Sequence, residues 1–268
     1  MAGIPSIPKI NRFLTSVSTS GSVSPEAAYI AAITSAGATV TAPQRAAIST
    51  FMSAEIAAGR WDGIKRLYFP VWGLAAANAI CMKSLTSATF VGAFTHASGY
   101  IQGGSNKYIV VPSLTDMGLT VESHHITAIV KTPTTINYSV LINGAGLSTA
   151  YTEEDYTVAL QGVTVSSGLQ NATSYYFGIL TFGGTRNSRY HKMRQISSLE
   201  YLPTTSTSVP GNFSNGVPTT LMGTASSNYW FGQIGGFSFS NYMSDEQDTA
   251  YTLALKTLWE STTGLTLP

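Results

Sequence analysis

The spacing of apolar residues near the start of the chain predicts two helices. Apolar positions recur there every three or four residues, and signals for helix ends bracket them. The first helix is expected from Pro25, with Ser24 as its N-cap, to Gly37. The second begins at a capping box of Thr41 and Gln44, in which each side chain bonds the other residue's backbone amide. These patterns indicate a small helical region ahead of the rest of the chain.

The stretch from Ala57 to Gly73, AAGRWDGIKRLYFPVWG, concentrates aromatic and basic residues. Its apolar residues lie three or four positions apart, which predicts a third short helix from Trp61 to Tyr68, stopped by Pro70. The stretch is too short and too interrupted by charges to be a membrane anchor. We interpret it as a joint that fixes the helices to the following region. The residues assigned to this joint are Trp61, Ile64, Leu67, Tyr68, Pro70 and Trp72.

After about residue 80 the pattern changes to short runs rich in Val, Ile, Thr, Tyr and Phe, separated by Gly, Asn, Ser and Pro. Evenly spaced runs of this kind are typical of a β-sandwich or barrel. The expected strands lie within residues 107–112, 124–131, 136–143, 156–161, 174–182, 200–203 and 233–240. A capping box of Ser244 and Gln247 then predicts a C-terminal helix over residues 245–261.

These patterns divide the chain into three parts. Residues 1–24, with two prolines and a Ser/Thr-rich tract, are expected to be an extended N-terminal arm that orders against a partner. Residues 25–79 form a helical leader region, and residues 80–268 form a β-sandwich closed by the C-terminal helix. The predicted fold class is therefore mainly β, with a small α-helical region in front.

The composition of the chain restricts its possible functions more than its possible folds. Hydrophobic residues make up 44% of the chain, which suffices for a large core, but only 10% are charged, far below the usual quarter. Such a surface suits a protein covered by neighbours in an assembly. The net charge of +1 provides no field to attract nucleic acid or an acidic membrane. The lone Cys81 excludes an internal disulfide, and the N-terminus does not resemble a secretory signal.

The histidines are the first candidates for catalysis or metal binding. They are His96, His124, His125 and His191. On a strand, His124 and His125 point to opposite faces, so they cannot chelate one metal ion together. We expect these side chains to be exposed or at an interface. The sequence thus predicts no enzyme, no catalytic residue, no bound metal and no cofactor.

An acidic loop is a candidate contact site. Glu153, Glu154 and Asp155 follow one another between Tyr151 and Tyr156. A glycosidase needs two carboxylates that face each other across a cleft, whereas consecutive acids usually form a solvated loop. We predict that this loop contacts a glycan or a protein partner.

A basic stretch over residues 183–195 is a second candidate contact site. Arg186 and Arg189 lie in it beside further cations and a tyrosine. That mixture is suited to binding phosphate or stacking on bases. Because the net charge of the chain is close to zero, pairing with an acidic patch on a neighbouring subunit is the favoured interpretation.

Two segments resemble laminin-G-like, concanavalin-type jelly-roll domains. Residues 102–113, QGGSNKYIVVPS, resemble the opening strand of these domains, and residues 229–247, YWFGQIGGFSFSNYMSDEQ, resemble their closing strand. Residues 27–73 are similar to helical leaders of bacteriophage virion proteins, including tail-fibre-like and head-associated ones. Those leaders end in a W-D-x-I-K-x-L-Y turn before a laminin-G-like domain.

The resemblance implies an antiparallel concanavalin/laminin-G-like jelly-roll sandwich in a structural component of a bacteriophage virion, in the tail, in a fibre or on the capsid. Its expected partners are other virion proteins and further copies of itself, and its expected location is the virion, after synthesis in the host cytoplasm. The alternative is a lectin-like module that binds host-surface polysaccharide. Calcium, which many such domains hold, is not expected, because Asn106 and Lys107 stand at the opening turn.

Overall fold

The structure is a computed structural model. It describes residues 23–132, 139–144, 147–151, 156–160, 163–167, 178–185, 188–194, 213, 216–224 and 229–267.

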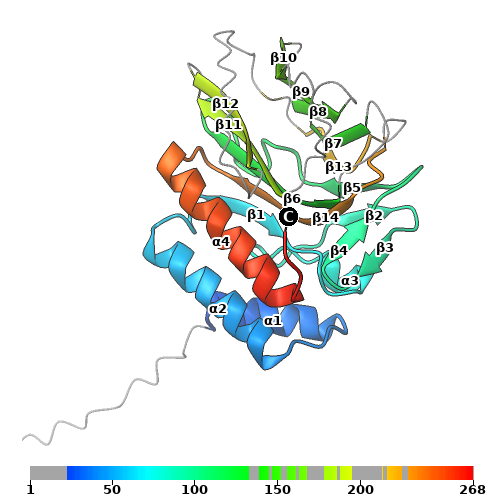
Figure 1. The fold of residues 1–268 in the computed structure, drawn as a ribbon, viewed down its shortest axis with the longest axis vertical. Helices are drawn as coiled ribbons and strands as arrows, with labels where there is room; N and C mark the ends of the chain where they lie inside the picture. The colour runs from blue at the N-terminus through cyan, green and yellow to red at the C-terminus, as the bar shows by residue number, and fades with distance from the viewer. Residues whose placement is uncertain are drawn as a thin grey trace, which may run out of the picture.

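Two seven-stranded antiparallel sheets form the larger part of the regular secondary structure in the described chain (Figure 1). The first sheet has the order β12 (Ser188–Arg194), β11 (Gly178–Thr185), β6 (His124–Thr132), β14 (Gln233–Ser240), β4 (Tyr100–Gln102) and β3 (Thr95–Ala97), and β1 (Ile64–Tyr68) also pairs with β14. The second has the order β10 (Val163–Ser167), β9 (Tyr156–Leu160), β8 (Leu147–Tyr151), β7 (Ser139–Gly144), β13 (Thr219–Leu221), β5 (Tyr108–Val111) and β2 (Thr89–Val91). The chain is thus a mainly β protein of the expected jelly-roll sandwich class.

A hydrophobic core lies between the two sheets. Ile126 and Val130 of β6 and Phe237 of β14 belong to it from the first sheet, and Ile109 and Leu221 belong to it from the second. Each of these side chains is at most 3% exposed. Burial of alternate residues from facing strands is the usual way in which a sandwich holds its sheets together.

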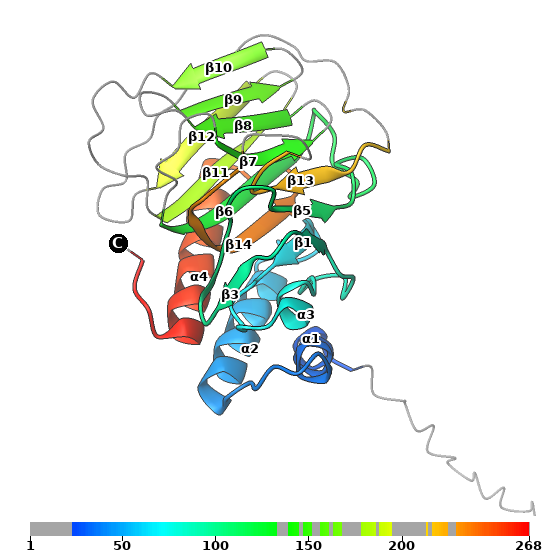
Figure 2. The same cartoon turned by 90° about the vertical axis from the view of Figure 1, so that its right-hand side faces the viewer.

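Helices cover the other face of the first sheet (Figure 2). They are α1 (Pro25–Ser35), α2 (Ala42–Ala57), the short α3 (Ala75–Asn78) and α4 (Asp245–Thr263). The capping boxes predicted at Thr41–Gln44 and Ser244–Gln247 are both formed. Gly264 ends α4 in the left-handed conformation at φ 69°, two residues beyond the predicted end.

A second hydrophobic core fills the space between these helices and the sheet. Tyr29 of α1, Phe51 of α2 and Trp259 of α4 meet Ile129 of β6 in it. The indole Nε1 of Trp259 donates to the carbonyl oxygen of Gly99 at 2.9 Å. The central strands β6 and β14 are therefore buried on both faces over most of their length, one face against the second sheet and one against the helices.

The helix predicted from Trp61 to Tyr68 is wrong, because Ile64–Tyr68 is strand β1, paired antiparallel with β14. The register shifts between Ile64 and Arg66, so one extra residue bulges there. The bulge places Ile64 and Leu67 on the helix-facing side of the sheet, opposite Ser240 and Ser238 respectively. A bulged strand thus produced the three-residue spacing that imitates a helix.

Most of the predicted strands are confirmed. The segments predicted at 107–112, 124–131, 136–143, 156–161, 174–182 and 233–240 contain all or most of β5, β6, β7, β9, β11 and β14. The segment predicted at 200–203 lies outside the described residues. Strands as short as β2, β3, β4 and β13 have too few residues to show alternation, and the sequence did not reveal them. The longer strands β8, β10 and β12 were not predicted either.

Candidate functional site

A serine, a histidine and an aspartate line up where α4 crosses the first sheet. His125 Nδ1 lies 3.1 Å from Ser240 Oγ, and His125 Nε2 lies 2.9 Å from Asp248 Oδ1. These are the residue types of a hydrolytic triad, but the ring nitrogens are exchanged, since in a triad Nε2 faces the serine and Nδ1 faces the aspartate. The side chains of His125 and Asp248 are 0% exposed, and Ser240 is 0% exposed as a residue. No substrate can reach this serine in the folded chain, so the arrangement serves to attach α4 to the sheet.

The same helix makes a second buried polar contact with β14. Tyr251 Oη lies 2.5 Å from Ser238 Oγ, and both residues are buried. Burial raises the pKa of Tyr251 above its usual range, so the phenol remains neutral. The His125–Asp248 and Ser238–Tyr251 contacts thus pair buried polar groups of α4 with those of the sheet, as burial favours.

The expectation that His124 and His125 are exposed or at an interface is wrong, because both are buried. They do lie on opposite faces of β6. His125 faces α4, whereas the His124 ring packs 5.5 Å from the Phe213 ring. Strand β6 is covered on both faces, which removes solvent from each side chain. Among the described residues, no group of three or more His, Cys, Asp or Glu side chains could hold a metal ion.

An ion pair closes the end of α2. Arg60 Nε and its terminal nitrogen donate to the two carboxylate oxygens of Glu55 at 2.7 and 2.8 Å. The Glu55 side chain is 0% exposed and that of Arg60 is 15% exposed. The hydrogen bonds with Glu55 raise the pKa of Arg60. The pair neutralises a buried carboxylate and fixes the chain as it enters β1.

The predicted joint residues are distributed over both sides of the first sheet. Trp61, Ile64 and Leu67 belong to the core beneath the helices, whereas Tyr68 belongs to the core between the sheets. Pro70 follows β1 and lines a small internal space. Whether these residues act as a joint between two parts stays a prediction, but β1 itself hydrogen-bonds with the sandwich strand β14.

Trp72 connects the helices to the strands through a chain of hydrogen bonds. Its indole Nε1 donates to Tyr29 Oη of α1 at 3.0 Å. Its backbone N–H donates to Asn78 Oδ1 at 2.8 Å, which directs the Asn78 Nδ2 group toward His96 Nδ1 at 3.0 Å. Since an amide nitrogen only donates, His96 Nδ1 must accept and carries no proton. Burial accordingly lowers the pKa of His96.

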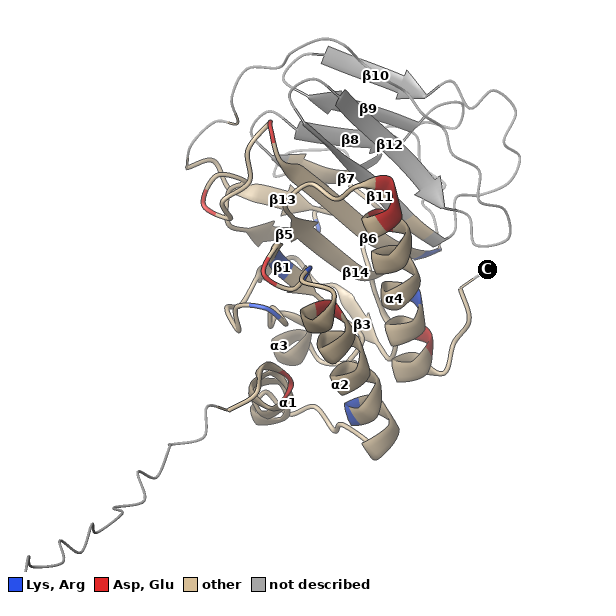
Figure 3. Ribbon diagram, turned by 90° about the vertical axis from the view of Figure 1, so that its left-hand side faces the viewer, with Lys and Arg blue, Asp and Glu red and all other residues tan. Residues whose placement is uncertain are grey.

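The outer surface of α1 and α2 carries almost no charge (Figure 3). Apart from Arg45, every exposed position on these two helices is Ala, Pro, Ser, Thr or Ile. On α4, the exposed residues after the first two turns are Leu253, Thr257 and Ser261. Leu253 is 62% exposed and Ile56 is 48% exposed. We call this surface of α1, α2 and α4 the helical face.

A groove of about 710 Å³ runs between α2 and α4 on the helical face. The two helices are antiparallel there, because Gln44 near the start of α2 donates to the Thr262 carbonyl near the end of α4 at 3.0 Å. Small or apolar residues make up most of its walls. They include Pro43, Ala47 and Ala54 from α2, and Ala250, Leu253 and Ser261 from α4.

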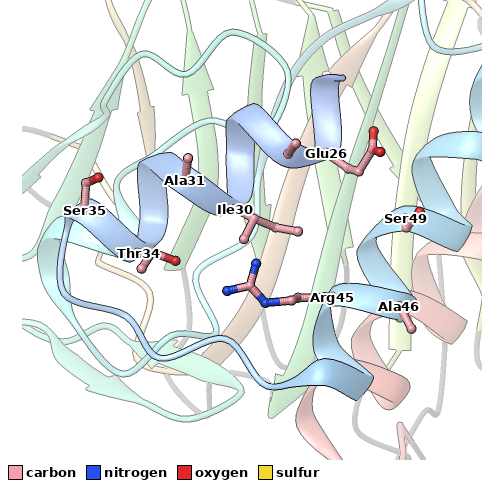
Figure 4. Close-up of a pocket in the computed structure, with 9 residues that line it drawn as sticks. Glu26, Ile30, Ala31, Thr34, Ser35, Arg45, Ala46 and Ser49 are labelled. Carbon is pink, nitrogen blue, oxygen red and sulfur yellow. The ribbon is translucent and has the colours of Figure 1, made fainter. Parts of the chain in front are cut away.

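A second groove, of about 600 Å³, lies between α1 and α2 (Figure 4). Ile30 and Thr34 of α1 face Arg45 of α2 across it. The Arg45 Nε donates to the Val40 carbonyl at 3.3 Å, which holds this cation at the rim. The helical face therefore has two adjacent grooves, one on each side of α2.

The predicted acidic loop connects two adjacent strands. Tyr151 at the end of β8 and Tyr156 at the start of β9 are opposite each other in register. Glu153, Glu154 and Asp155 belong to the connection between them and lie outside the described residues. The contact role of this loop stays a prediction.

The predicted basic stretch is largely strand. Arg189 lies on β12, opposite Gly184 of β11. Arg186 stands between these strands in the sequence and lies outside the described residues. The strands that flank the acidic and the basic candidates thus belong to different sheets. The helical face was not predicted as a site, because its exposed Ala, Ser and Thr residues form no chemical motif in the sequence.

No described helix is long and apolar enough to cross a membrane. Neither a protein family nor a curated protein matches the sequence.

Several solved structures are similar to this chain at low sequence identity. One is domain 4 of AbnA, an extracellular GH43 arabinanase from Geobacillus stearothermophilus, in complex with arabinotriose. It is 11% identical over 70% of this chain and 98% of that one, at a TM-score of 0.48. Another is botulinum neurotoxin type C, whose cell entry depends on interaction with two ganglioside molecules. It is 10% identical over 74% of this chain and 53% of the toxin chain, at a TM-score of 0.49.

A third similar structure is the CBM2 module of the evolved Dit protein of Lactobacillus casei BL23 phage J-1. It is 13% identical over 60% of this chain and 93% of that chain, at a TM-score of 0.38.

Proposed function

We propose that this protein is a structural component of a bacteriophage virion that acts through protein–protein contacts, with the helical face as its main contact surface. The single observation that carries the proposal is the near absence of charge on that face, together with its two grooves. A face of this kind loses little hydration free energy when another protein covers it, because few charged groups must give up water.

The exposed apolar residues reinforce this choice of surface. Leu253 and Ile56 lie on two different helices of one face, and both are large side chains with about half or more of their area exposed. Grouped apolar exposure of this kind marks contact sites in soluble proteins, whereas single exposed apolar residues do not. The low charge of the whole chain, 10%, points in the same direction.

The virion setting rests on the sequence resemblance of residues 27–73 to phage leaders. A role without catalysis is supported by the burial of the one Ser–His–Asp arrangement in the described chain. Helices of the leader region and the C-terminal helix jointly form the helical face, so a contact there would hold both ends of the described chain.

Incorporation into particles tests the proposal. The gene for this chain is deleted from a phage that encodes it. The deletion is then complemented with the wild-type chain, with Leu253→Glu or with Val217→Glu. Val217 is 48% exposed and lies beside β13 in the sandwich, so it is the matched control. We expect wild-type and Val217→Glu chains in purified particles and a loss of Leu253→Glu. A folded wild-type chain that is absent from purified particles would refute the virion role.

A glycan-binding function is the second candidate, and one patch on the first sheet favours it. Lys131 Nζ lies 4.0 Å from the centroid of the Tyr100 ring and donates to Gln233 Oε1 at 3.1 Å. Gln233 Nε2 lies 3.4 Å from Gln102 Oε1, and Thr132 Oγ1 donates to Gln233 Oε1 at 3.0 Å. An aromatic ring beside amide and hydroxyl groups is suited to a sugar, which has apolar faces and a hydroxyl rim.

A host polysaccharide would then be the partner of this patch. Binding to a panel of bacterial cell-wall polysaccharides, compared between wild type and Tyr100→Ala, tests the candidate. Affinity that Tyr100→Ala lowers by about tenfold, roughly 1.4 kcal/mol, would support it. No binding by the wild-type chain in its assembled state would eliminate it.

A further inference from the structure

The N-terminal segment has a repeating pattern that its helix-forming neighbours lack. Ile4, Ile7, Ile10 and Phe13 are spaced three residues apart, and Pro5 follows the first of them. A polyproline II helix has three residues per turn, so this spacing places the four apolar side chains along one edge. The basic residues of the segment, Lys9 and Arg12, fall together on a second edge.

Proline favours that conformation in the segment. Pro5 and Pro8 fix their own φ near the polyproline II value, and each restricts the residue before it to extended conformations. Those preceding residues are Ile4 and Ile7, two members of the apolar edge. The segment therefore loses less conformational entropy than an ordinary chain when it binds in this form.

The groove between α2 and α4 matches this edge in length. Pro43 and Ala54, at opposite ends of its α2 wall, are eleven residues apart, or about 17 Å at the helical rise. Ile4 and Ile10 are six residues apart, or about 19 Å at the polyproline II rise. Three isoleucines of one edge thus cover the length of the groove.

The charge of the N-terminal segment is also opposite to that at one end of the groove. The exposed acidic residues at the start of α4 are Asp245 and Glu246, whereas the carboxylates of Glu55 and Asp248 are buried against Arg60 and His125. Residues 1–22 contain Lys9 and Arg12 and no acid. Because α2 and α4 are antiparallel, the exposed carboxylates of Asp245 and Glu246 stand at the end of the groove where α2 finishes. That end suits the basic edge of the segment.

We infer that the groove between α2 and α4 binds residues 4–13 of a neighbouring copy of this chain, in a polyproline II conformation with Ile4, Ile7 and Ile10 in the groove. The inference rests on the proposed assembly function and names its contact. Helix α2 lies between α1 and α4 (Figures 2 and 3), so a chain's own segment, which joins α1 at Val23, would have to cross α2 to enter the groove. Each copy offers one segment and one groove, so the contact is head-to-tail and links copies into a ring or a row.

Disulfide trapping in the full-length protein tests the inference. The wild-type chain suits this method, because its one cysteine, Cys81, is 0% exposed. Tagged copies with Ile10→Cys are mixed with untagged copies with Leu253→Cys and oxidised. We expect a mixed dimer that forms at least about tenfold faster than with Val217→Cys copies, because docking raises the local concentration of the two thiols.

The double variant Ile10→Cys/Leu253→Cys distinguishes the source of the segment. Exchange between copies gives a ladder of linked chains, whereas docking in the same chain gives an oxidised monomer and would overturn the inference. Trapping no faster than with Val217→Cys, in a protein that is still oligomeric by light scattering, would overturn the inference and leave the assembly function standing. A monomeric wild-type protein that also shows no trapping would refute both.

A composition-preserving variant tests the three-residue period. Exchanging positions 9 and 10, as Lys9→Ile/Ile10→Lys, keeps every residue type and moves one isoleucine off the apolar edge. We expect association to weaken by about tenfold, as for loss of an anchor residue in a contact. The control exchanges positions 14 and 15, as Leu14→Thr/Thr15→Leu, neither of which is in phase with the period, and it should have no effect. Equal association of the period variant and the wild type would contradict the inference.

Discussion

Individual polar residues in the buried layers act in pairs, and the cost of losing one partner depends on how buried the other is. Glu55 is 0% exposed and relies on two hydrogen bonds from Arg60. Arg45, also on the helical face, is exposed and makes one bond to a carbonyl. The two arginines are chemically alike but differ in what their removal leaves behind.

Replacing Arg60 by Met should lower the free energy of unfolding by about 3 kcal/mol, because it leaves the Glu55 carboxylate buried without its cation. Urea denaturation measures the change. The matched variant Arg45→Met should alter stability by less than about 0.5 kcal/mol. Equal effects of the two substitutions would contradict the structural role assigned to the Glu55–Arg60 pair.

His96 should make stability fall in mild acid. Burial lowers its pKa below the ordinary value of 6.5, and its Nδ1 must stay unprotonated to accept from Asn78. The unfolded chain therefore binds this proton more readily than the folded one, so the contribution is complete above pH 6.5 and is lost as the pH falls through the folded pKa.

The variant His96→Gln isolates that contribution, because its Oε1 accepts from Asn78 without titrating. The difference in unfolding free energy between wild type and variant is measured from pH 7.5 to pH 5. We expect the variant to lose less stability than the wild type on acidification. Parallel losses would show that His96 does not titrate as proposed.

At the scale of elements, close approach of α4 to β14 depends on a residue without a side chain. A Cβ on Gly235 would collide with the Nε1 of Trp259 and approach its Cδ1 to 2.7 Å. Trp259 is fully buried and bonded to the Gly99 carbonyl, so it has little freedom to move. The pattern QIGGFSFS predicted a strand, but it did not show that Trp259 of a helix packs directly against Gly235.

The variant Gly235→Ala should lower the free energy of unfolding by about 2 kcal/mol, the usual cost of overpacking a core. Thermal or urea unfolding, followed by tryptophan fluorescence, reports the change. Thr257→Ala, at an exposed position of the same helix, is the comparison and should cost less than about 0.5 kcal/mol. An unaltered unfolding curve for Gly235→Ala would contradict the packing of α4 described above.

Local sequence signals predicted some of these elements correctly and others wrongly. Capping boxes at Thr41 and Ser244 located the starts of α2 and α4, because the capping chemistry is local. Strand β1 was taken for a helix because its bulge puts Ile64 and Leu67 on one face. Pairing with β14 decided the outcome, and no local pattern contains that information.

For the whole molecule, the sequence was sufficient to predict a mainly β sandwich with a helical region, but not how the parts meet. The contact between α2 and α4 joins residues some 200 positions apart, as from Gln44 to Thr262, and it creates the helical face. The acidic and basic segments that the sequence favoured as contact sites were chosen by charge. The helical face is distinguished by the lack of charge, a property that becomes visible only when the helices are assembled.

The most direct test of the account is the mass of the full-length chain in solution, measured by sedimentation velocity over a range of concentrations. The account predicts that the wild-type protein and Val217→Glu associate reversibly, whereas Leu253→Glu sediments as a folded monomer. A wild-type protein that remains a monomer at every concentration would contradict it. So would equal association of Leu253→Glu and the wild type, since the helical face would then not be the contact surface.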